Sequence, residues 1–86
     1  MATYKILYWQ EIPSQIIVED DSEDCTVQLA DRFQERIDLM AAKRGLQDTD
    51  SYLAQWKWSD WEEREGTARE VATALIAELE AQADWQ

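Results

Sequence analysis

The sequence predicts an α+β domain with the element order β-β-α-β-α, in which a three-stranded, mainly antiparallel sheet carries two helices on one face. Three observations predict this fold. Two stretches near the N-terminus are rich in β-forming residues, and the first of them alternates as a half-buried strand does. Two later stretches repeat apolar residues every three or four positions, as amphipathic helices do, and another alternating stretch lies between them. Because each helix has one apolar stripe, the simplest packing places both helices on the same sheet face.

The first two strands are expected to form a hairpin. Residues 3–9 alternate around β-forming side chains and predict the first strand. Gln15 to Glu19 predict the second strand, and Pro13, which has no N–H to donate to a ladder, lies in the short connection. A connection of this length joins antiparallel strands. The next run, Glu19 to Asp24, holds five acids in six residues, so we expect a solvated loop.

The first helix is expected over Ala30 to Arg44. Charged side chains fill most of the face opposite its apolar stripe. Lys43 and Arg44 complement the helix dipole at the C-terminal end, and Gly45 supplies the stop. The apolar stripe consists of Leu29, Phe33, Ile37, Met40 and Ala41.

The second half of the chain supplies a third strand and a second helix. Tyr52 to Trp58 alternate and predict the strand, although the apolar spacing also permits a short helix. Asp60 to Glu65 return to dense acid. Thr67-Ala-Arg-Glu70 is a capping box, in which the Thr hydroxyl and the Glu carboxylate each satisfy a free backbone N–H, so the last helix begins there. Its buried stripe is expected to be Val71, Ala72, Leu75, Ile76 and Leu79.

The two faces of the sheet differ in polarity. The more consistently apolar set is placed toward Phe33, Ile37, Leu75 and Leu79 of the helices; it comprises Tyr4, Ile6, Tyr8, Ile16, Val18, Ala54, Trp56 and Trp58. The opposite face would display Leu7, Trp9, Ile17 and Leu53, which are too apolar for a face that only meets water. We therefore expect a partner-binding patch centred on Trp9. What covers this patch stays open: the acidic loop or Trp85, a second copy in a homodimer, or a different protein.

Composition excludes several functional classes. The chain is long enough for one small domain, 1–86, and carries 19 Asp and Glu against 8 Lys and Arg, a net charge of −11. No basic stripe is present for nucleic acid, and the same acidity disfavours an anionic membrane surface. The apolar runs are far too short for a bilayer span, and the N-terminus lacks the apolar core of a signal peptide. A cytoplasmic location is therefore expected.

Nothing in the sequence predicts an enzyme. Histidine is absent, and Cys25, beside Asp24, has no evident base to activate it. Acid pairs such as Glu62 and Glu63 lie in hydrophilic runs, where a solvated face is much the commoner outcome. The acidic runs lack the alternation and central glycine of a calcium loop. We therefore predict no catalytic residue, no cofactor and no metal.

Three tryptophans, Trp56, Trp58 and Trp61, stand within six residues. Such a cluster could stack on a base or a sugar. With few basic residues beside it, core packing is favoured over that binding role.

Three stretches resemble a known family. Tyr8-Trp-Gln-Glu-Ile-Pro-Ser-Gln-Ile16 closes the hairpin, Arg32-Phe-Gln-Glu-Arg-Ile-Asp38 begins the first helix, and Tyr52-Leu-Ala-Gln-Trp-Lys57 starts the third strand. Together they resemble the small bacterial domain described as "virulence factor", over most of the chain to about residue 58. That domain is also similar to a segment of the staphylococcal conserved virulence factor C, where it accompanies a NifU-N-like scaffold domain and HEAT-type repeats. The resemblance implies a cytosolic α+β domain and defines no catalytic residues.

Two functional hypotheses follow. The first is a non-enzymatic interaction module that presents the sheet face around Trp9 to a protein partner or to a second copy. The second, suggested by the family's association with an iron–sulfur scaffold domain, is an accessory subunit or small-ligand binder in cofactor, Fe–S assembly or one-carbon metabolism. With a single cysteine, this chain has no set of thiolates to hold a cluster itself. A deep cavity beside Trp56 or Trp58 would favour the second hypothesis.

Phe33 is the firmest core prediction, because it lies at the centre of the first helical stripe. Phe33→Ala should lower the free energy of unfolding by roughly 3–5 kcal/mol through cavity formation. A small domain has only about 5–10 kcal/mol in total, so urea denaturation should show a large fall in the midpoint. A midpoint that barely moves would show that the helix packs through a different face.

Overall fold

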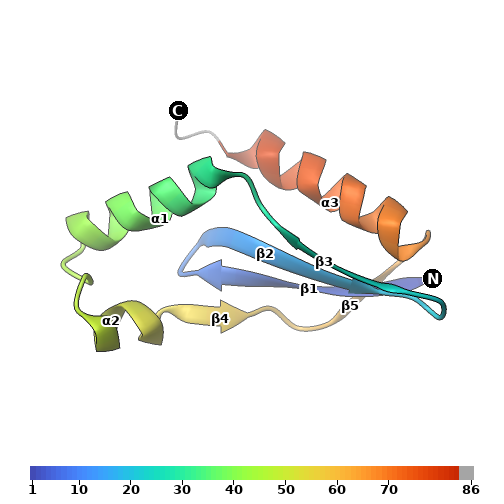
Figure 1. Ribbon diagram of the computed structural model, residues 1–86, viewed down its shortest axis with the longest axis horizontal. Coiled ribbons are helices and arrows are strands. Elements are labelled where there is room, and N and C mark those ends of the chain that lie inside the picture. Colours follow the sequence, from blue (N-terminus) through green and yellow to red (C-terminus); the bar gives the residue numbers. More distant parts are fainter. Residues whose placement is uncertain (84–86) are drawn as a thin grey trace.

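The structure is a computed structural model, and it describes residues 1–83. A single antiparallel sheet forms one layer, and two long helices lie one after the other over one of its faces (Figure 1). A short helix, labelled α2, lies beyond the tip of the first hairpin (Figure 1). In chain order the elements are β1 (Ala2–Trp9), β2 (Ile12–Glu19), β3 (Asp24–Gln28), α1 (Asp31–Lys43), α2 (Thr49–Ala54), β4 (Trp56–Trp58), β5 (Glu62–Arg64) and α3 (Ala68–Gln82).

The sheet is built around β1. Strand β2 pairs along one edge of β1, and β3 pairs with β2 on the far side. The other edge of β1 is shared, because β4 pairs with its C-terminal part and β5 with its N-terminal part. All these pairings are antiparallel, which confirms the predicted α+β class. The prediction of three strands is wrong, since the sheet contains five and its order is β3-β2-β1-β4, with β5 also on β1.

The two strands that the prediction missed are short, and each lies within or at the end of an acidic run. Strand β3 occupies the end of the acidic run, where Cys25 and Val27 face inward and are half-buried. Strand β5 is Glu62 to Arg64, within a stretch that we expected to be a solvated acidic run. Both are edge strands, where charged side chains are common because one edge and one face meet water.

The acidic turn between β2 and β3 is more ordered than a solvated loop. The carboxylate of Asp20 accepts hydrogen bonds from the backbone N–H groups of Ser22 and Glu23, at 2.7 and 2.8 Å. Its other oxygen accepts from the N–H of Ala68, at 2.7 Å, at the start of α3. These donors, that of Ala68 first, lower the pKa of Asp20. One acid of the run therefore ties the turn to a helix N-terminus, where negative charge is favoured.

The predicted third strand begins later than expected. Residues Thr49 to Ala54 form α2 instead, and only Trp56 to Trp58 are extended. The local reason is a helix cap, because the side chain of Asp48 accepts a hydrogen bond from the N–H of Ser51. Ala54 is therefore exposed on a helix and does not face the core.

The two long helices match their predictions closely. Helix α1 buries Phe33, Ile37 and Ala41. At the start of α3 both bonds of the capping box are present: the N–H of Glu70 donates to Thr67 Oγ1 at 3.1 Å, and the N–H of Thr67 donates to Glu70 Oε1 at 3.0 Å. The buried residues of α3 are Ala68, Val71, Ala72, Leu75 and Leu79, so the predicted stripe is confirmed except for Ile76, which is half-buried.

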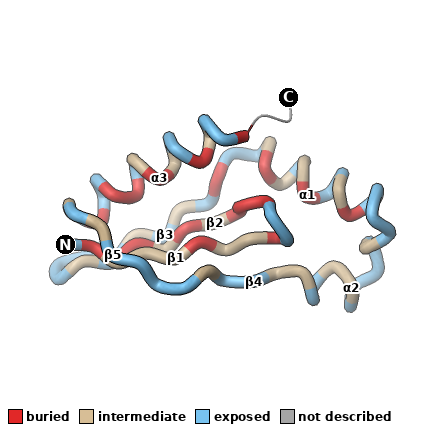
Figure 2. The backbone as a smooth tube through the Cα atoms, turned by 180° about the vertical axis from the view of Figure 1, so that it is seen from behind, coloured by how far each residue is buried: buried red, intermediate tan, exposed pale blue. Residues whose placement is uncertain are grey.

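The core lies between the sheet and the helix layer, as the buried segments of Figure 2 show. Ile6, Ile16 and Val18 face inward as predicted and are buried, while Tyr4 and Tyr8 are half-buried. Trp58 was also placed inward, and this is wrong, because its side chain is 43% exposed. The largest fully buried side chains are Trp9, Phe33, Ile16, Ile37, Val18 and Val71.

Trp9 is the largest correction to the sequence prediction. It was expected to be open to a partner, but none of its surface is exposed. Its indole N–H donates to the carbonyl oxygen of Tyr52 at 3.0 Å, and the two rings lie 5.7 Å apart. Tyr52 in turn packs edge-on against Trp56, with centroids 6.0 Å apart. Because α2 folds around the hairpin tip, it covers the end of β1 that a third strand would have left open.

The chain between the helices is also fastened to the hairpin turn. Gln10 adopts φ 55 in this two-residue connection, and its N–H donates to the carbonyl oxygen of Gln55 at 3.1 Å. Arg44, just after α1, forms two hydrogen bonds to the carboxylate of Glu11, at 2.8 and 2.7 Å, and also donates to Gln10 Oε1. These contacts hold α2 against the end of the sheet.

Trp9→Ala should therefore be strongly destabilising. It removes a fully buried ring and leaves a cavity between β1 and α2, so the free energy of unfolding should fall by roughly 3–5 kcal/mol in urea titrations. Leu53→Ala, on the same short helix but 59% exposed, should change it by less than about 0.5 kcal/mol. Equal effects from the two substitutions would show that α2 does not cover Trp9.

Candidate functional site

The sheet face that turns away from the helices is open. On this outer face β1 contributes Thr3, Lys5 and Leu7, which the register aligns with Glu19, Ile17 and Gln15 of β2. None of these six residues is buried. The inward-facing Ile6, Ile16 and Val18 beside them are at most 7% exposed. The open face is thus a candidate contact surface that is built on rigid strands.

A bulge between β4 and β5 shapes one side of this face. Leu7 pairs with Trp58 and Tyr4 pairs with Glu62, so three residues, 59–61, oppose the two residues of β1 that lie between. Ser59 keeps the ladder intact, since its N–H donates to the carbonyl of Ile6 and its Oγ accepts from the N–H of Ile6, both at 2.8 Å. The extra residue shifts the alternation of side chains, which brings Trp61 to the same face as Trp58.

Lys5 lies between these two tryptophans. Its Nζ atom is 4.5 Å from the centroid of Trp58 and 4.9 Å from that of Trp61. Both distances are within the range of a cation–π contact. The rings remain 43% and 48% exposed, so water reaches the group. We call Lys5, Trp58 and Trp61 the tryptophan–lysine cluster; Leu7 and Ile17 continue its apolar surface along the sheet.

Acidic residues surround the tryptophan–lysine cluster in the sequence and in space. Asp60 lies within the bulge, and Glu63 pairs with Thr3 on the outer face. Lys5 is the basic side chain that strands β1 to β5 place on this face, since Lys57 pairs with Tyr8 and Arg64 with Ala2. Arg64 also forms an ion pair with Glu78 of α3. The cluster is therefore an aromatic site in a negative field.

The four residues predicted as a partner-binding patch have different fates. Leu7 and Ile17 lie on the open face and are half-buried, as neighbours on paired strands. Trp9 is buried under α2, and Leu53 is exposed on α2, away from the sheet ladder. Trp85, which was considered as a cover for this face, lies outside the described residues.

Sequence reasoning missed the tryptophan–lysine cluster. Among the three neighbouring tryptophans, only Trp56 packs partly against the core, so the expectation of core packing fails for Trp58 and Trp61. One signal was present: Trp58 and Trp61 are separated by Ser-Asp within a run of charged residues. Side chains at this spacing share a sheet face only if the strand contains an extra residue, and bulges are common at sheet edges.

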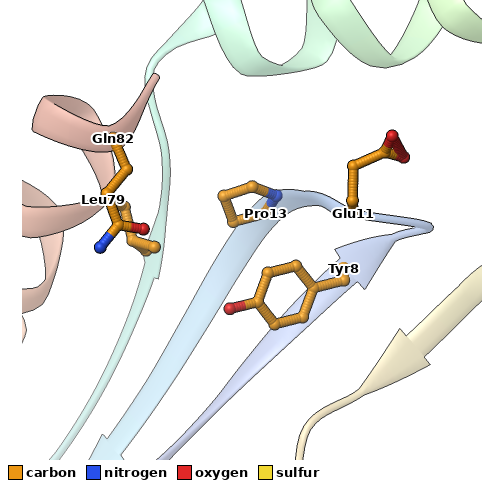
Figure 3. A pocket seen from close by; sticks show the side chains of 5 residues that line it. All are labelled: Tyr8, Glu11, Pro13, Leu79 and Gln82. Carbon is orange, nitrogen blue, oxygen red and sulfur yellow. The ribbon is translucent and has the colours of Figure 1, made fainter. Parts of the chain in front are cut away.

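A shallow pocket of about 100 Å³ lies on the other side of the sheet, between the hairpin and α3. Tyr8 and Pro13 approach it from the strands and Leu79 and Gln82 from the helix, with Glu11 at its rim (Figure 3). Burial, followed by the charge of Glu62, raises the pKa of Tyr8. The hydrogen bonds from Arg44 lower the pKa of Glu11 to about 2. Neither Tyr8 nor Glu11 therefore changes protonation near neutral pH. The pocket is also smaller than ordinary ligand sites.

Within residues 1–83, no group of three or more Asp, Glu, Cys or His side chains could hold a metal ion. Cys25 is a half-buried free thiol on β3. No helix in the same range is long and apolar enough to cross a bilayer. The pocket between the hairpin and α3, the two pockets at the acidic turn and the pocket beside Tyr52 have linings that include neither Trp56 nor Trp58.

Fold and site together define a small α+β domain with one helix-covered sheet face and one open face that carries an aromatic cluster. The sequence pattern of the family described as "Virulence factor" matches residues 7–86, so the chain belongs to this family. The match extends beyond residue 58 through the bulge and the last helix, which the resemblance of the three stretches did not reach. A search of curated proteins and a search of solved structures each found no significant match.

The Glu11–Arg44 pair should make stability depend on acid pH. The folded-state pKa of Glu11, about 2, lies below the ordinary 4.5, so its contribution is complete well above pH 4.5 and is lost as pH falls toward 2. In urea titrations at about pH 7, 6, 3 and 2, the stability difference between wild type and Glu11→Gln should be constant at the two higher values and shrink at the two lower ones. Glu35→Gln, on the exposed side of α1, controls for the loss of one negative charge. A difference that stays constant down to pH 2 would contradict the pairing.

Proposed function

We propose that this protein is a non-enzymatic interaction module that binds a protein partner through the open face of its sheet. The observation that supports this most strongly is the tryptophan–lysine cluster, in which two large aromatic rings are 43% and 48% exposed beside Leu7 and Ile17. Tryptophan is enriched where protein surfaces meet, and contiguous exposed apolar surface is uncommon on a chain that contacts only water. The centre of the proposed surface is thus this cluster and not Trp9.

The partner is expected to be a different protein, because charge disfavours a second copy. Each chain carries a net charge of −11, so two copies repel one another as they approach. A partner with positive charge around an apolar contact would instead be attracted. The bulge between β4 and β5 also interrupts one edge of the sheet. The open face is therefore a more continuous surface for a partner than this edge is.

The pocket between β1, β2 and α3 gives no specific support to the competing hypothesis, a small-ligand binder or accessory subunit for cofactor assembly. The cavity that would favour that hypothesis was expected beside Trp56 or Trp58, whereas this pocket is lined by other residues and is small. Trp56 contacts Tyr52 and packs against the core.

Site-specific photo-crosslinking in the native cell tests the proposal. A benzophenone amino acid at Ile17, on the open face, should capture one discrete partner. The same probe at Leu39, 45% exposed on α1, should not. The purified partner should then bind wild type and lose at least about tenfold in affinity with Trp58→Ser, a change typical of an interface anchor. Because Trp58 is exposed, the melting temperature of this variant should stay within a few degrees of wild type.

Three results would contradict the proposal. The first is equal capture from the two probe positions. The second is capture of this same chain alone, which would identify a homodimer. The third is partner binding that Trp58→Ser leaves unchanged.

A further inference from the structure

We propose that Trp58 and Trp61 form a slot for a cationic side chain, arginine or lysine, from a basic segment of the partner, and that Lys5 occupies this slot until the partner displaces it. This inference rests on the proposed function and names the chemistry that the open face recognises. The starting observation is geometric: two rings from either end of one bulge already hold an ammonium group, at 4.5 and 4.9 Å from their centroids.

The slot is accessible and its present occupant is replaceable. Nearly half of each ring is exposed, so a second group can approach without opening the core. Lys5 is attached to the central strand by a flexible four-carbon stem and can swing into water while its backbone stays in the ladder. A cation–π contact at an exposed position is weak, and arginine binds ring faces more often than lysine does. A partner's guanidinium can therefore compete with Lys5.

The electric field around the slot selects a cation. The chain carries a net charge of −11; Asp60 lies within the bulge between the two tryptophans, and Glu63 pairs with Thr3 on the same face. An acidic partner that sought Lys5 would have to enter this negative field. A basic segment is attracted at long range. Lys5 thus occupies the space between the rings in the free protein, so a partner must bring a cation that binds the rings more strongly.

The bulge fixes the positions of the two rings that form the slot. Ser59 holds the two hydrogen bonds to Ile6 that fix the bulge, and the register then fixes which face Trp58 and Trp61 share. The rings are consequently set by the ladder rather than by a loose loop. A site held by strands loses little freedom on binding, which favours affinity.

The test uses the whole chain and two capped peptides of alternating glycine and arginine or glycine and citrulline. Citrulline has the shape of arginine without its charge. In isothermal titration at low salt, the arginine peptide should bind wild type at least about tenfold more tightly than the citrulline peptide. Replacing both rings, Trp58→Leu with Trp61→Leu, should remove most of this preference. Thermal melts confirm that each variant is folded.

The Lys5→Met variant tests whether Lys5 competes with the arginine peptide for the two rings. It keeps an apolar stem but frees the slot, so the arginine peptide should bind about threefold to fivefold more tightly, the scale of one exposed cation–π contact. The matched control is Lys57→Met, which removes the same charge from an exposed residue that pairs with Tyr8. It should give a clearly smaller gain. In proton NMR, the ε-methylene signals of Lys5 should be shifted upfield by the rings in the free protein and should return to ordinary values when the arginine peptide is added.

Two results would overturn the slot. One is weaker binding, or a gain no larger than that of Lys57→Met, in the Lys5→Met variant. The other is equal affinity for the arginine and citrulline peptides. If either result is obtained while crosslinking from Ile17 still captures a partner whose binding depends on Trp58, the proposed interaction module is retained. The proposal that it binds a cationic side chain is then rejected. If arginine binds but no partner is captured, the proposed function fails and the slot remains a binding site for a cation.

Discussion

The structure depends on β1, because this one strand carries three ladders. Strand β2 occupies one edge of β1, and β4 and β5 share the other. The two faces of the strand have different roles: Ile6 is buried in the core beneath the helices, while Lys5 and Leu7 lie on the open face. Core and candidate site are therefore built on the same eight residues. A site supported in this way keeps its side chains in fixed positions, which a loop of the same composition would not do.

A single extra residue gives the open face its character. In a regular strand, side chains three positions apart point to opposite faces, so Trp58 and Trp61 would be separated by the sheet. The bulge at 59–61 reverses the second half of the alternation, and Ser59 replaces the contact that the ladder would otherwise lose. The bulge also interrupts the sheet edge. Natural sheets use such interruptions to discourage edge-to-edge pairing, which leaves the face as the better contact surface.

The acidity of the chain has two separate consequences. Some carboxylates are structural: Asp20 accepts hydrogen bonds from three backbone N–H groups, and Glu11 and Glu78 are paired with arginines. Other carboxylates remain on the surface and create the negative field around Lys5. This field opposes self-association, and under the proposed function it favours a positively charged partner. The net charge alone cannot separate the structural carboxylates from the surface ones, because it does not show which carboxylates accept hydrogen bonds.

The sequence by itself determined the elements whose signals are local. The stripe through Phe33 and the capping box at Thr67 define α1 and α3, alternation defines β1, and a run of β-forming residues defines β2. Strands β3 and β5 were not predictable in this way, because segments of three to five residues in or beside an acidic run become strands only when a neighbouring strand supplies the ladder. The tertiary structure alone decided that Trp9 is buried and that Trp58 and Trp61 are exposed. The physical reason is register: one residue of offset moves a side chain to the other face of a sheet, and only contacts between distant segments fix that offset.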